Sequence, residues 1–138
     1  MAIDRFDQLR VYRTAFEGAM QLFEFSKRWP KEERYALTDQ VRRSSRSICA
    51  NIAEAWCKRR FERHFISKLT DAHAEAEETR VWIRFAARCG YLTMTEASDL
   101  DEAYASVCGG LVNMLTAPGK WCGPATLVRE EDMGYDIA

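Results

Sequence analysis

Few side chains in this 138-residue sequence stand at spacings that catalysis or metal binding requires. Asn51 and Glu54 come nearest to a site, because residues three apart share a helix face and an amide beside a carboxylate can bind a ligand. His64 and His73 lie nine residues apart, more than two helical turns, and therefore cannot share one metal ion. No metalloprotease, P-loop, dinucleotide-binding, calcium-loop or di-iron motif occurs. The sequence therefore predicts no enzyme, no cofactor and no metal site, and it favours a structural role for Asn51 and Glu54.

The composition is typical of a soluble globular protein with reduced thiols. The cysteines are odd in number and lack a CxxC pair; they are Cys49, Cys57, Cys89, Cys108 and Cys122. The net charge of −1 and the isoelectric point near 6.1 argue against a nucleic-acid coat protein, for which values above about 9 are usual. The start of the chain has no apolar signal segment, and no uncharged run reaches the ~20 residues of a membrane span. We therefore expect a cytoplasmic protein that does not enter a membrane.

Residues 29–56 are the most strongly patterned stretch and predict a helix that is apolar on two sides. Thr38 can cap this helix, and nothing interrupts it before about Arg60. One apolar stripe predicts the side that faces the core: Leu37, Val41, Ile48, Ile52 and Ala55. A polar stripe runs beside it: Gln40, Ser44, Ser47, Asn51, Glu54 and Lys58. The far side is also small and apolar, with Cys49, Ala50, Ala53 and Trp56. Such a helix is usually covered on both sides.

Three further helices carry one apolar seam each. The first, over residues 4–28 and ended by Pro30, has the seam Leu9, Tyr12, Phe16, Ala19 and Phe23. The third, over residues 62–89, has the seam Phe65, Leu69, Ala72, Ala76, Thr79, Ile83 and Ala86. The fourth follows a capping box of Thr93 and Glu96 and has the seam Leu100, Tyr104, Val107, Leu111 and Met114. These seams predict an all-α protein, an up-down antiparallel four-helix bundle over residues 1–117.

Glycines and prolines mark the ends and the weak points of these helices. Gly90 is the expected C-terminal cap of the third helix. Gly109 falls level with Ala76, which favours a close contact between the third and fourth helices over a local kink. Residues 118–138 are rich in glycine, proline and acidic residues and predict a non-helical tail. The tail can pack on the bundle or on a neighbouring subunit through Trp121, Leu127, Val128 and Tyr135.

The polar stripe predicts a network between the second and third helices. If these helices are antiparallel about a turn near residue 60, Arg43 lies level with Glu77 and within reach of Glu75 or Glu78. A buried asparagine must find partners, so Asn51 is expected to be hydrogen-bonded and Glu54 to be partly buried. The predicted network comprises Gln40, Ser47, Asn51, Glu54, Glu75 and Glu78.

Charge is unevenly spread along the chain. Residues 40–68 hold eight Lys or Arg against two acids, a balance of +6, whereas residues 71–102 hold three Arg against eight acids, a balance of −5. The two segments can neutralise each other within or between subunits, or the basic one can face RNA or DNA. The candidate nucleic-acid-binding residues are Arg42, Arg46, Lys58, Arg59, Arg60 and Arg63. The near-neutral overall charge favours the first interpretation.

Residues 29–55 resemble the signature of bacterial proteins encoded in intervening sequences of 23S ribosomal RNA genes. The matching residues are Trp29, Pro30, Glu32, Glu33, Tyr35, Leu37, Thr38, Gln40, Arg42, Arg43, Ser44, Ser45, Ser47, Ile48, Asn51, Ile52, Ala53, Glu54 and Ala55. Trp29 and Ala55 replace the family's usual phenylalanine and glycine. The resemblance covers about residues 5–116 and implies an up-down bundle that assembles as a homopentamer, with no enzymatic activity. A related branch, the accessory proteins of diversity-generating retroelements, binds nucleic acid and a reverse transcriptase.

The far side of the second helix predicts an assembly. A monomer would expose Cys49, Ala50, Ala53 and Trp56 as an apolar patch, and such patches mark interaction sites. An identical subunit is the simplest cover, and head-to-tail contacts can close into a ring. We therefore expect a homo-oligomeric scaffold, with the number five implied by the resemblance. A nucleic-acid-binding accessory protein is the alternative.

Overall fold

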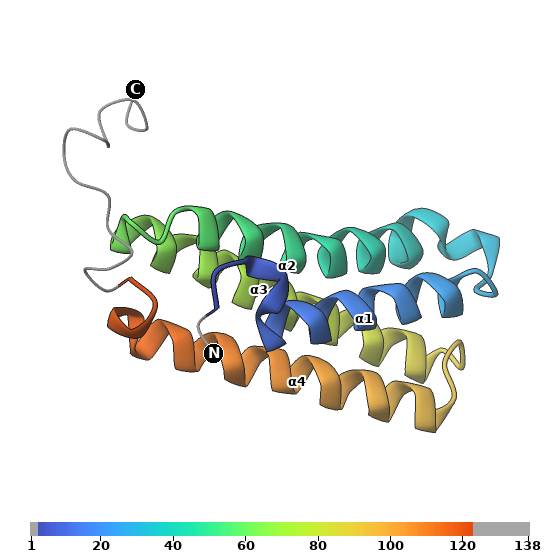
Figure 1. The fold of residues 1–138 in the computed structure, drawn as a ribbon. Helices are drawn as coiled ribbons and strands as arrows, with labels where there is room; N and C mark the ends of the chain where they lie inside the picture. The colour runs from blue at the N-terminus through green and yellow to red at the C-terminus, as the bar shows by residue number, and fades with distance from the viewer. Residues whose placement is uncertain (1–2, 123–138) are drawn as a thin grey trace.

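Four antiparallel helices form the protein in a computed structural model that describes residues 3–122 (Figure 1). The helices are α1 (Arg10–Ser26), α2 (Asp39–Cys57), α3 (Glu62–Arg88) and α4 (Met94–Thr116). Each packs along the next, and α1 also packs along α4, so the four close into a bundle around one core. The described residues contain no strand, which confirms the predicted all-α up-down bundle. None of these helices is long and apolar enough to cross a bilayer.

The seams of α2, α3 and α4 are those that the sequence predicts. All five apolar positions of the second helix, from Leu37 to Ala55, are buried. The same holds for the seven positions from Phe65 to Ala86 and the five from Leu100 to Met114. Thr93 and Glu96 form the predicted capping box, and Gly90 ends α3 with a φ of 79°. Periodicity therefore identifies the core faces of these three helices.

The predicted seam of the first helix is confirmed at Leu9 and Ala19, which are buried, and is wrong at its three aromatic positions. The helix begins at Arg10, not residue 4, because a 3-10 turn (η1, Phe6–Gln8) and an extended Leu9 precede it. Its buried residues are Val11, Ala15, Gly18, Ala19, Leu22 and Ser26. Of the predicted aromatic seam, Tyr12 and Phe23 are half-buried and Phe16 is 45% exposed. The inward positions of α1 are small where side chains of α4 press against its backbone, since the buried Tyr104 ring lies directly over Gly18.

Glycine permits this close approach of α1 to α4. A Cβ built on Gly18 would lie 2.7 Å from the Tyr104 hydroxyl, and one on Gly110 would lie 2.4 Å from Val11 Cγ1. The predicted contact of Gly109 with α3 is wrong, because Gly109 is exposed and a Cβ there would meet nothing within 4 Å. The close contact is made one residue later and toward α1.

Three element ends differ from their predictions. The chain enters α2 through a 3-10 turn (η2, Lys31–Glu33) and a π-helical turn (η3, Arg34–Thr38), so Thr38 is helical and makes no side-chain cap. The second helix ends at Cys57, where Lys58 leaves helical geometry with φ −102° and ψ 12°. The tail was predicted to be non-helical, but after Thr116 it starts with a 3-10 turn (η4, Pro118–Lys120). Backbone hydrogen bonds to the carbonyls of Ala117 and Pro118 stabilise this turn. Of its expected anchors, Leu127, Val128 and Tyr135 lie outside the described residues.

Adjacent glycines in α4 give a matched pair of substitutions. Gly109→Ala should raise the free energy of unfolding by up to about 1 kcal/mol, because alanine is the better helix former and the site is open. Gly110→Ala should lower it, because overpacking against Val11 costs about 1–3 kcal/mol and outweighs that gain. Urea unfolding at one protein concentration measures both. Equal stabilisation by the two substitutions would contradict a tight α1–α4 contact.

Candidate interaction surface on α1 and α2

Asn51 and Glu54 do not converge on a site. The Asn51 amide donates to the Ser47 carbonyl at 2.9 Å and to the Ser47 hydroxyl at 3.1 Å, so its hydrogen bonds stay within one helical turn. Asn51 is half-buried and hydrogen-bonded, as predicted. The Glu54 carboxylate is 52% exposed and pairs with Lys68 at 2.9 Å, so the expectation that Glu54 is partly buried is wrong. Glu54 is exposed because its position around the helix axis places it at the edge of α2 that faces solvent beside α3.

The predicted register of α2 against α3 is confirmed. The Arg43 guanidinium donates to Glu75 at 3.0 Å and to Glu78 at 2.5 Å. Burial tends to raise the pKa of Glu78, but hydrogen bonds from Trp82 and Arg43 and the charge of Arg43 hold it below its usual value. These side chains form an exposed clamp between the helices rather than a catalytic carboxylate pair.

The buried centre of the polar network is a pair that the predicted set does not include. The hydroxyls of Ser44 and Thr79 lie 2.8 Å apart, both fully buried between α2 and α3. Thr79 also donates to the Glu75 carbonyl at 2.9 Å. The sequence could have predicted this pair, because Ser44 of the polar stripe and Thr79 of the facing seam lie at similar distances from the turn between the two helices. Gln40, a member of the predicted network, is half-buried near the start of α2.

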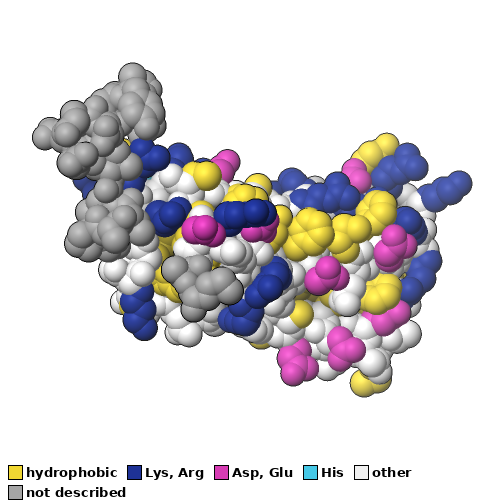
Figure 2. Space-filling view, in the orientation of Figure 1, with side chains coloured by type: hydrophobic (Ala, Val, Ile, Leu, Met, Phe, Trp, Pro, Cys, Tyr) yellow, Lys and Arg dark blue, Asp and Glu magenta, His cyan; other side chains and the backbone are white. Residues whose placement is uncertain are grey.

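A second apolar surface follows the outer side of α1 and continues onto α2. We name it the α1–α2 face, and it comprises Tyr12, Phe16, Met20, Phe23, Cys49, Ala50 and Ala53. The four α1 residues recur at steps of four and three, which places them in one stripe. Phe16 and Met20 are each 45% exposed. Figure 2 shows hydrophobic side chains gathered along α1, with Lys and Arg side chains beside them.

Ring contacts link the aromatic residues of this surface, and Cys49 of α2 lies near them. Tyr12 stacks on Phe16 with ring centroids 5.9 Å apart and meets Phe6 edge-on at 5.0 Å. Burial raises the pKa of Tyr12, and the nearby Cys49 of α2 raises it further. Burial alone raises the pKa of the Cys49 thiol to about 11, so this thiol is protonated at neutral pH and packs as an apolar group. The α1–α2 face therefore offers shape and apolar area rather than reactivity.

Arginines of α2 border this surface at Phe23. The guanidinium of Arg42 lies 4.8 Å from the centre of the Phe23 ring, and that of Arg46 lies 5.7 Å from it. Arg42 also donates to the Ser26 hydroxyl at 2.9 Å. Lys27 covers the same ring at 4.6 Å. These cations are engaged by an aromatic ring of their own subunit, in contacts worth about 0.5–1 kcal/mol each at exposed sites.

Trp56 does not belong to the exposed surface, and its prediction as an interface residue is wrong. It is 6% exposed because residues before α1 and after α4 cover it. Its indole donates to the Asp4 carbonyl at 3.3 Å, and Trp121 meets it edge-on at 6.0 Å. Arg59 stacks on its ring at 4.1 Å. Cys49, Ala50 and Ala53 stay on the surface, half-buried or exposed, so the predicted interface loses only its aromatic member.

The six candidate nucleic-acid-binding residues divide into two groups. Arg42 and Arg46 flank Phe23, whereas Lys58, Arg59, Arg60 and Arg63 lie at the α2–α3 turn. From Arg46 to the end of α2 the helix rises about 16 Å. Arg59 is engaged by Trp56, and Lys58 and Arg63 are exposed. The six therefore do not form one continuous basic face.

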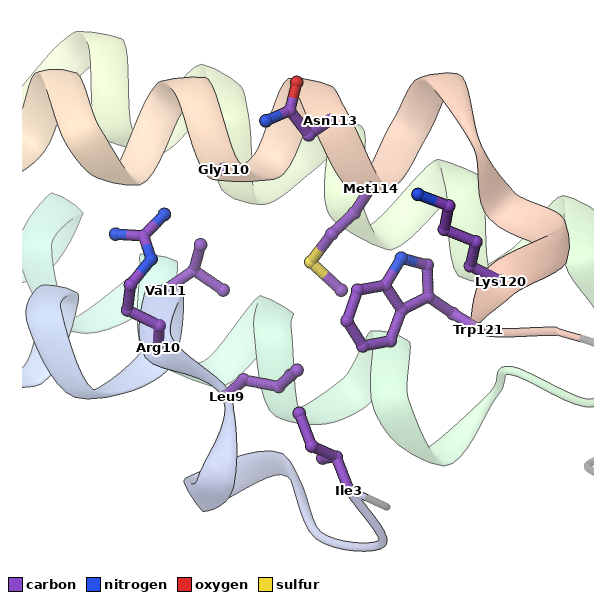
Figure 3. Close-up of a pocket in the computed structure, with 9 residues that line it drawn as sticks. All are labelled: Ile3, Leu9, Arg10, Val11, Gly110, Asn113, Met114, Lys120 and Trp121. Carbon is purple, nitrogen blue, oxygen red and sulfur yellow. The ribbon is translucent and has the colours of Figure 1, made fainter. Parts of the chain in front are cut away.

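A pocket of about 280 Å³ lies between the start of α1 and the end of α4 (Figure 3). Its apolar lining includes Leu9, Val11, Met114 and Trp121, with Arg10 at one side. The described residues that line it include no carboxylate, histidine or cysteine, and its polar groups are Arg10, Asn113 and Lys120.

The protein is an all-α bundle, and the α1–α2 face is an apolar surface outside its core. The sequence profile of the family described as 23S rRNA-intervening sequence protein matches residues 7–113, more than half of the chain. The chain belongs to the 23S rRNA-intervening sequence protein family. No curated protein matches the sequence.

A solved structure shares the fold. It is a crystal structure of a protein with unknown function from the S23 ribosomal protein family of Bacteroides thetaiotaomicron, with a TM-score of 0.69 and 27% sequence identity. The match covers 77% of this chain and 95% of that protein. The bundle is therefore shared over nearly the whole of the relative, whose own function is described as unknown.

Trp56 should contribute to the stability of the protomer. Trp56→Ala should lower the free energy of unfolding by about 3–5 kcal/mol, because it removes a buried ring. Trp56→Phe should cost less and leave the mass in solution unchanged. Trp82→Ala is the control, since Trp82 is only half-buried and should cost less than Trp56→Ala. Urea unfolding and light scattering measure the two effects. A Trp56→Phe protein that dissociates while keeping its stability would restore Trp56 to an interface.

Proposed function

We propose that this protein is a non-enzymatic homo-oligomeric scaffold whose subunits meet through the α1–α2 face. The observation that carries the proposal is the exposed stripe of Phe16 and Met20, each 45% exposed, beside the small residues of α2. Soluble monomers rarely expose a contiguous apolar patch of this kind without using it. The sequence predicts apolar residues on two sides of the second helix, and the structure adds α1 as another helix with an apolar outer side.

The composition of the face suits protein–protein contact. Aromatic residues and methionine are enriched at interfaces, and small residues such as Ala50 and Ala53 let a neighbouring helix approach closely. Arginines at the border, such as Arg46, can pair with carboxylates of the neighbour while the aromatic stripe is desolvated. The face is one surface of the protomer, and a closed ring forms when it meets a different surface of the next subunit. The subunit number of five rests on the family resemblance alone.

Charge introduced into the α1–α2 face should dissociate the assembly. Phe16→Glu combined with Met20→Glu should shift the mass from about 80 kDa, five times 15.9 kDa, to 15.9 kDa, because two carboxylates cannot be desolvated in an apolar contact. Size-exclusion chromatography with light scattering measures the mass. Met94→Glu is the matched control, since Met94 is 90% exposed on α4 and outside the face, and it should leave the mass unchanged.

The result that would contradict the proposal is a wild-type protein of 15.9 kDa at micromolar concentration. A wild-type oligomer that the double substitution leaves intact would place the interface on another surface. Circular dichroism of the double variant confirms that its helices are retained, since both substituted side chains already lie at the surface.

Nucleic-acid binding is the alternative function, and the cluster at the α2–α3 turn is the observation that favours it. Lys58 and Arg63 are exposed there, close to Arg59 and Arg60 in the chain. An accessory protein of the retroelement type would bind the phosphates of a nucleic acid with such a cluster. The clamp of Arg43 on Glu75 and Glu78 shows that part of the basic segment is neutralised internally, which favours the scaffold.

Duplex binding should be weak and sensitive to salt. We expect no submicromolar affinity for duplex DNA or RNA at about 150 mM salt, because two or three phosphate contacts give a shallow salt slope of roughly −2 to −3. Fluorescence anisotropy over a salt series measures it. Submicromolar binding that Lys58→Gln with Arg63→Gln abolishes, and that Arg84→Gln on α3 leaves intact, would favour the alternative over the scaffold.

A further inference from the structure

Three side chains with metal-ligating atoms meet at the surface between α3 and α4, across the bundle from the α1–α2 face. They are His73 and Glu77 of α3 and Cys108 of α4, and their ligand atoms all lie within 4.8 Å of one another. His73 Nε2 lies 3.6 Å from Glu77 Oε2. This is the one group of three or more such residues among the described part of the chain.

The fold brings these residues together by register. His73 and Glu77 stand four apart on α3 and therefore share one face. The third and fourth helices are antiparallel about the turn at Gly90, which places Cys108 level with His73. Cys108 is 6% exposed, whereas the His73 and Glu77 side chains are 32% and 52% exposed. The thiol thus forms the floor of the group, and the imidazole and the carboxylate stand at its rim, where an ion can enter.

The donor set is that of a zinc-class ion. Thiolate, imidazole and carboxylate are the three zinc ligands that proteins use, with bonds of about 2.0–2.3 Å. Tetrahedral coordination at such bond lengths requires ligand atoms roughly 3.3–3.8 Å apart. The ligand atoms are now up to 4.8 Å apart, and rotation of the His73 and Glu77 side chains can bring them into that range. Three protein ligands leave the fourth position for water. A thiolate disfavours magnesium and calcium.

A charged neighbour orients the group. Arg80 is held by Asp101 through bonds of 2.9 Å from Nε and 3.3 Å from Nη2. Its Nη1 donates to Glu77 Oε1 at 3.2 Å, which leaves Oε2 directed toward His73. Asp101 offsets the charge of Arg80, which Glu77 shares through this contact. Carboxylates fixed in this way from outside the coordination sphere are common at metal sites.

We propose that His73, Glu77 and Cys108 bind a zinc-class divalent ion and clamp α3 to α4. Binding replaces the thiol proton with the metal, so one proton is released to solvent and the affinity rises with pH. Burial raises the pKa of Cys108 to about 11, and the metal must compete with that proton. This inference is independent of the proposed assembly, because it involves neither helix of the α1–α2 face.

Cobalt spectroscopy on the full-length reduced protein tests the site. One equivalent of Co²⁺ should give a thiolate-to-cobalt charge-transfer band in the near ultraviolet, and Zn²⁺ should remove it by displacement. Cys108→Ser should abolish the band, whereas Cys57→Ser, at an exposed cysteine outside the group, should retain it. Mg²⁺ should not compete. A band that survives in Cys108→Ser, or that is absent from the wild type, overturns the proposal.

A second pair of variants separates loss of the site from loss of the fold. His73→Gln changes a side chain at the rim and should weaken Co²⁺ binding at least about tenfold. His64→Gln changes the other histidine, which is exposed near the start of α3, and should leave the affinity unchanged. Zn²⁺ should raise the melting temperature of the wild type and of His64→Gln, but not of His73→Gln. Equal affinities in the two histidine variants would overturn the assignment of His73 as a ligand.

Discussion

The close contact between α1 and α4 is the constraint on which the outer surface of this protein depends. Gly18 makes room for the Tyr104 ring, and Gly110 makes room for Val11, so a side chain of each helix packs onto the backbone of the other. The inner positions of α1 at this contact are therefore small or aliphatic. The aromatic residues Tyr12, Phe16 and Phe23 lie on the outer side of α1, beside the small apolar residues of α2.

The remaining helix pairs are held by contacts that fix register. Between α2 and α3 the buried Ser44–Thr79 pair is satisfied, and the Arg43 clamp lies beside it at the surface. A buried hydroxyl that loses its partner is costly, so a slip of either helix is disfavoured. Between α3 and α4 the Arg80–Asp101 pair has the same effect. The register that these pairs set is also what brings His73 and Cys108 together.

Segments that precede α1 and follow α4 meet over Trp56. The carbonyl of Asp4, the ring of Trp121 and the guanidinium of Arg59 cover it from three directions. They thereby cover an indole that α2 would otherwise expose. The stripe on α1 stays exposed, with Cys49, Ala50 and Ala53 beside it. On α3 and α4, titratable groups such as His73 and Glu77 share the surface with exposed apolar side chains, Val81 and Phe85 among them.

The sequence by itself determined the number and direction of the helices and the core faces of α2, α3 and α4, because large aliphatic or aromatic residues recur at the helical period along each of these seams. It also determined the Arg43 clamp, since helix register follows from distance to a turn. Only the tertiary structure decided which of two apolar stripes of α1 faces inward, because that choice depends on the space that Gly110 leaves on another helix. The cover of Trp56 was likewise decided in three dimensions, since it joins residues that no local spacing relates. Distance to the Gly90 turn places His73 level with Cys108, but only the rotation of the two packed helices turned both side chains to the same side of their contact.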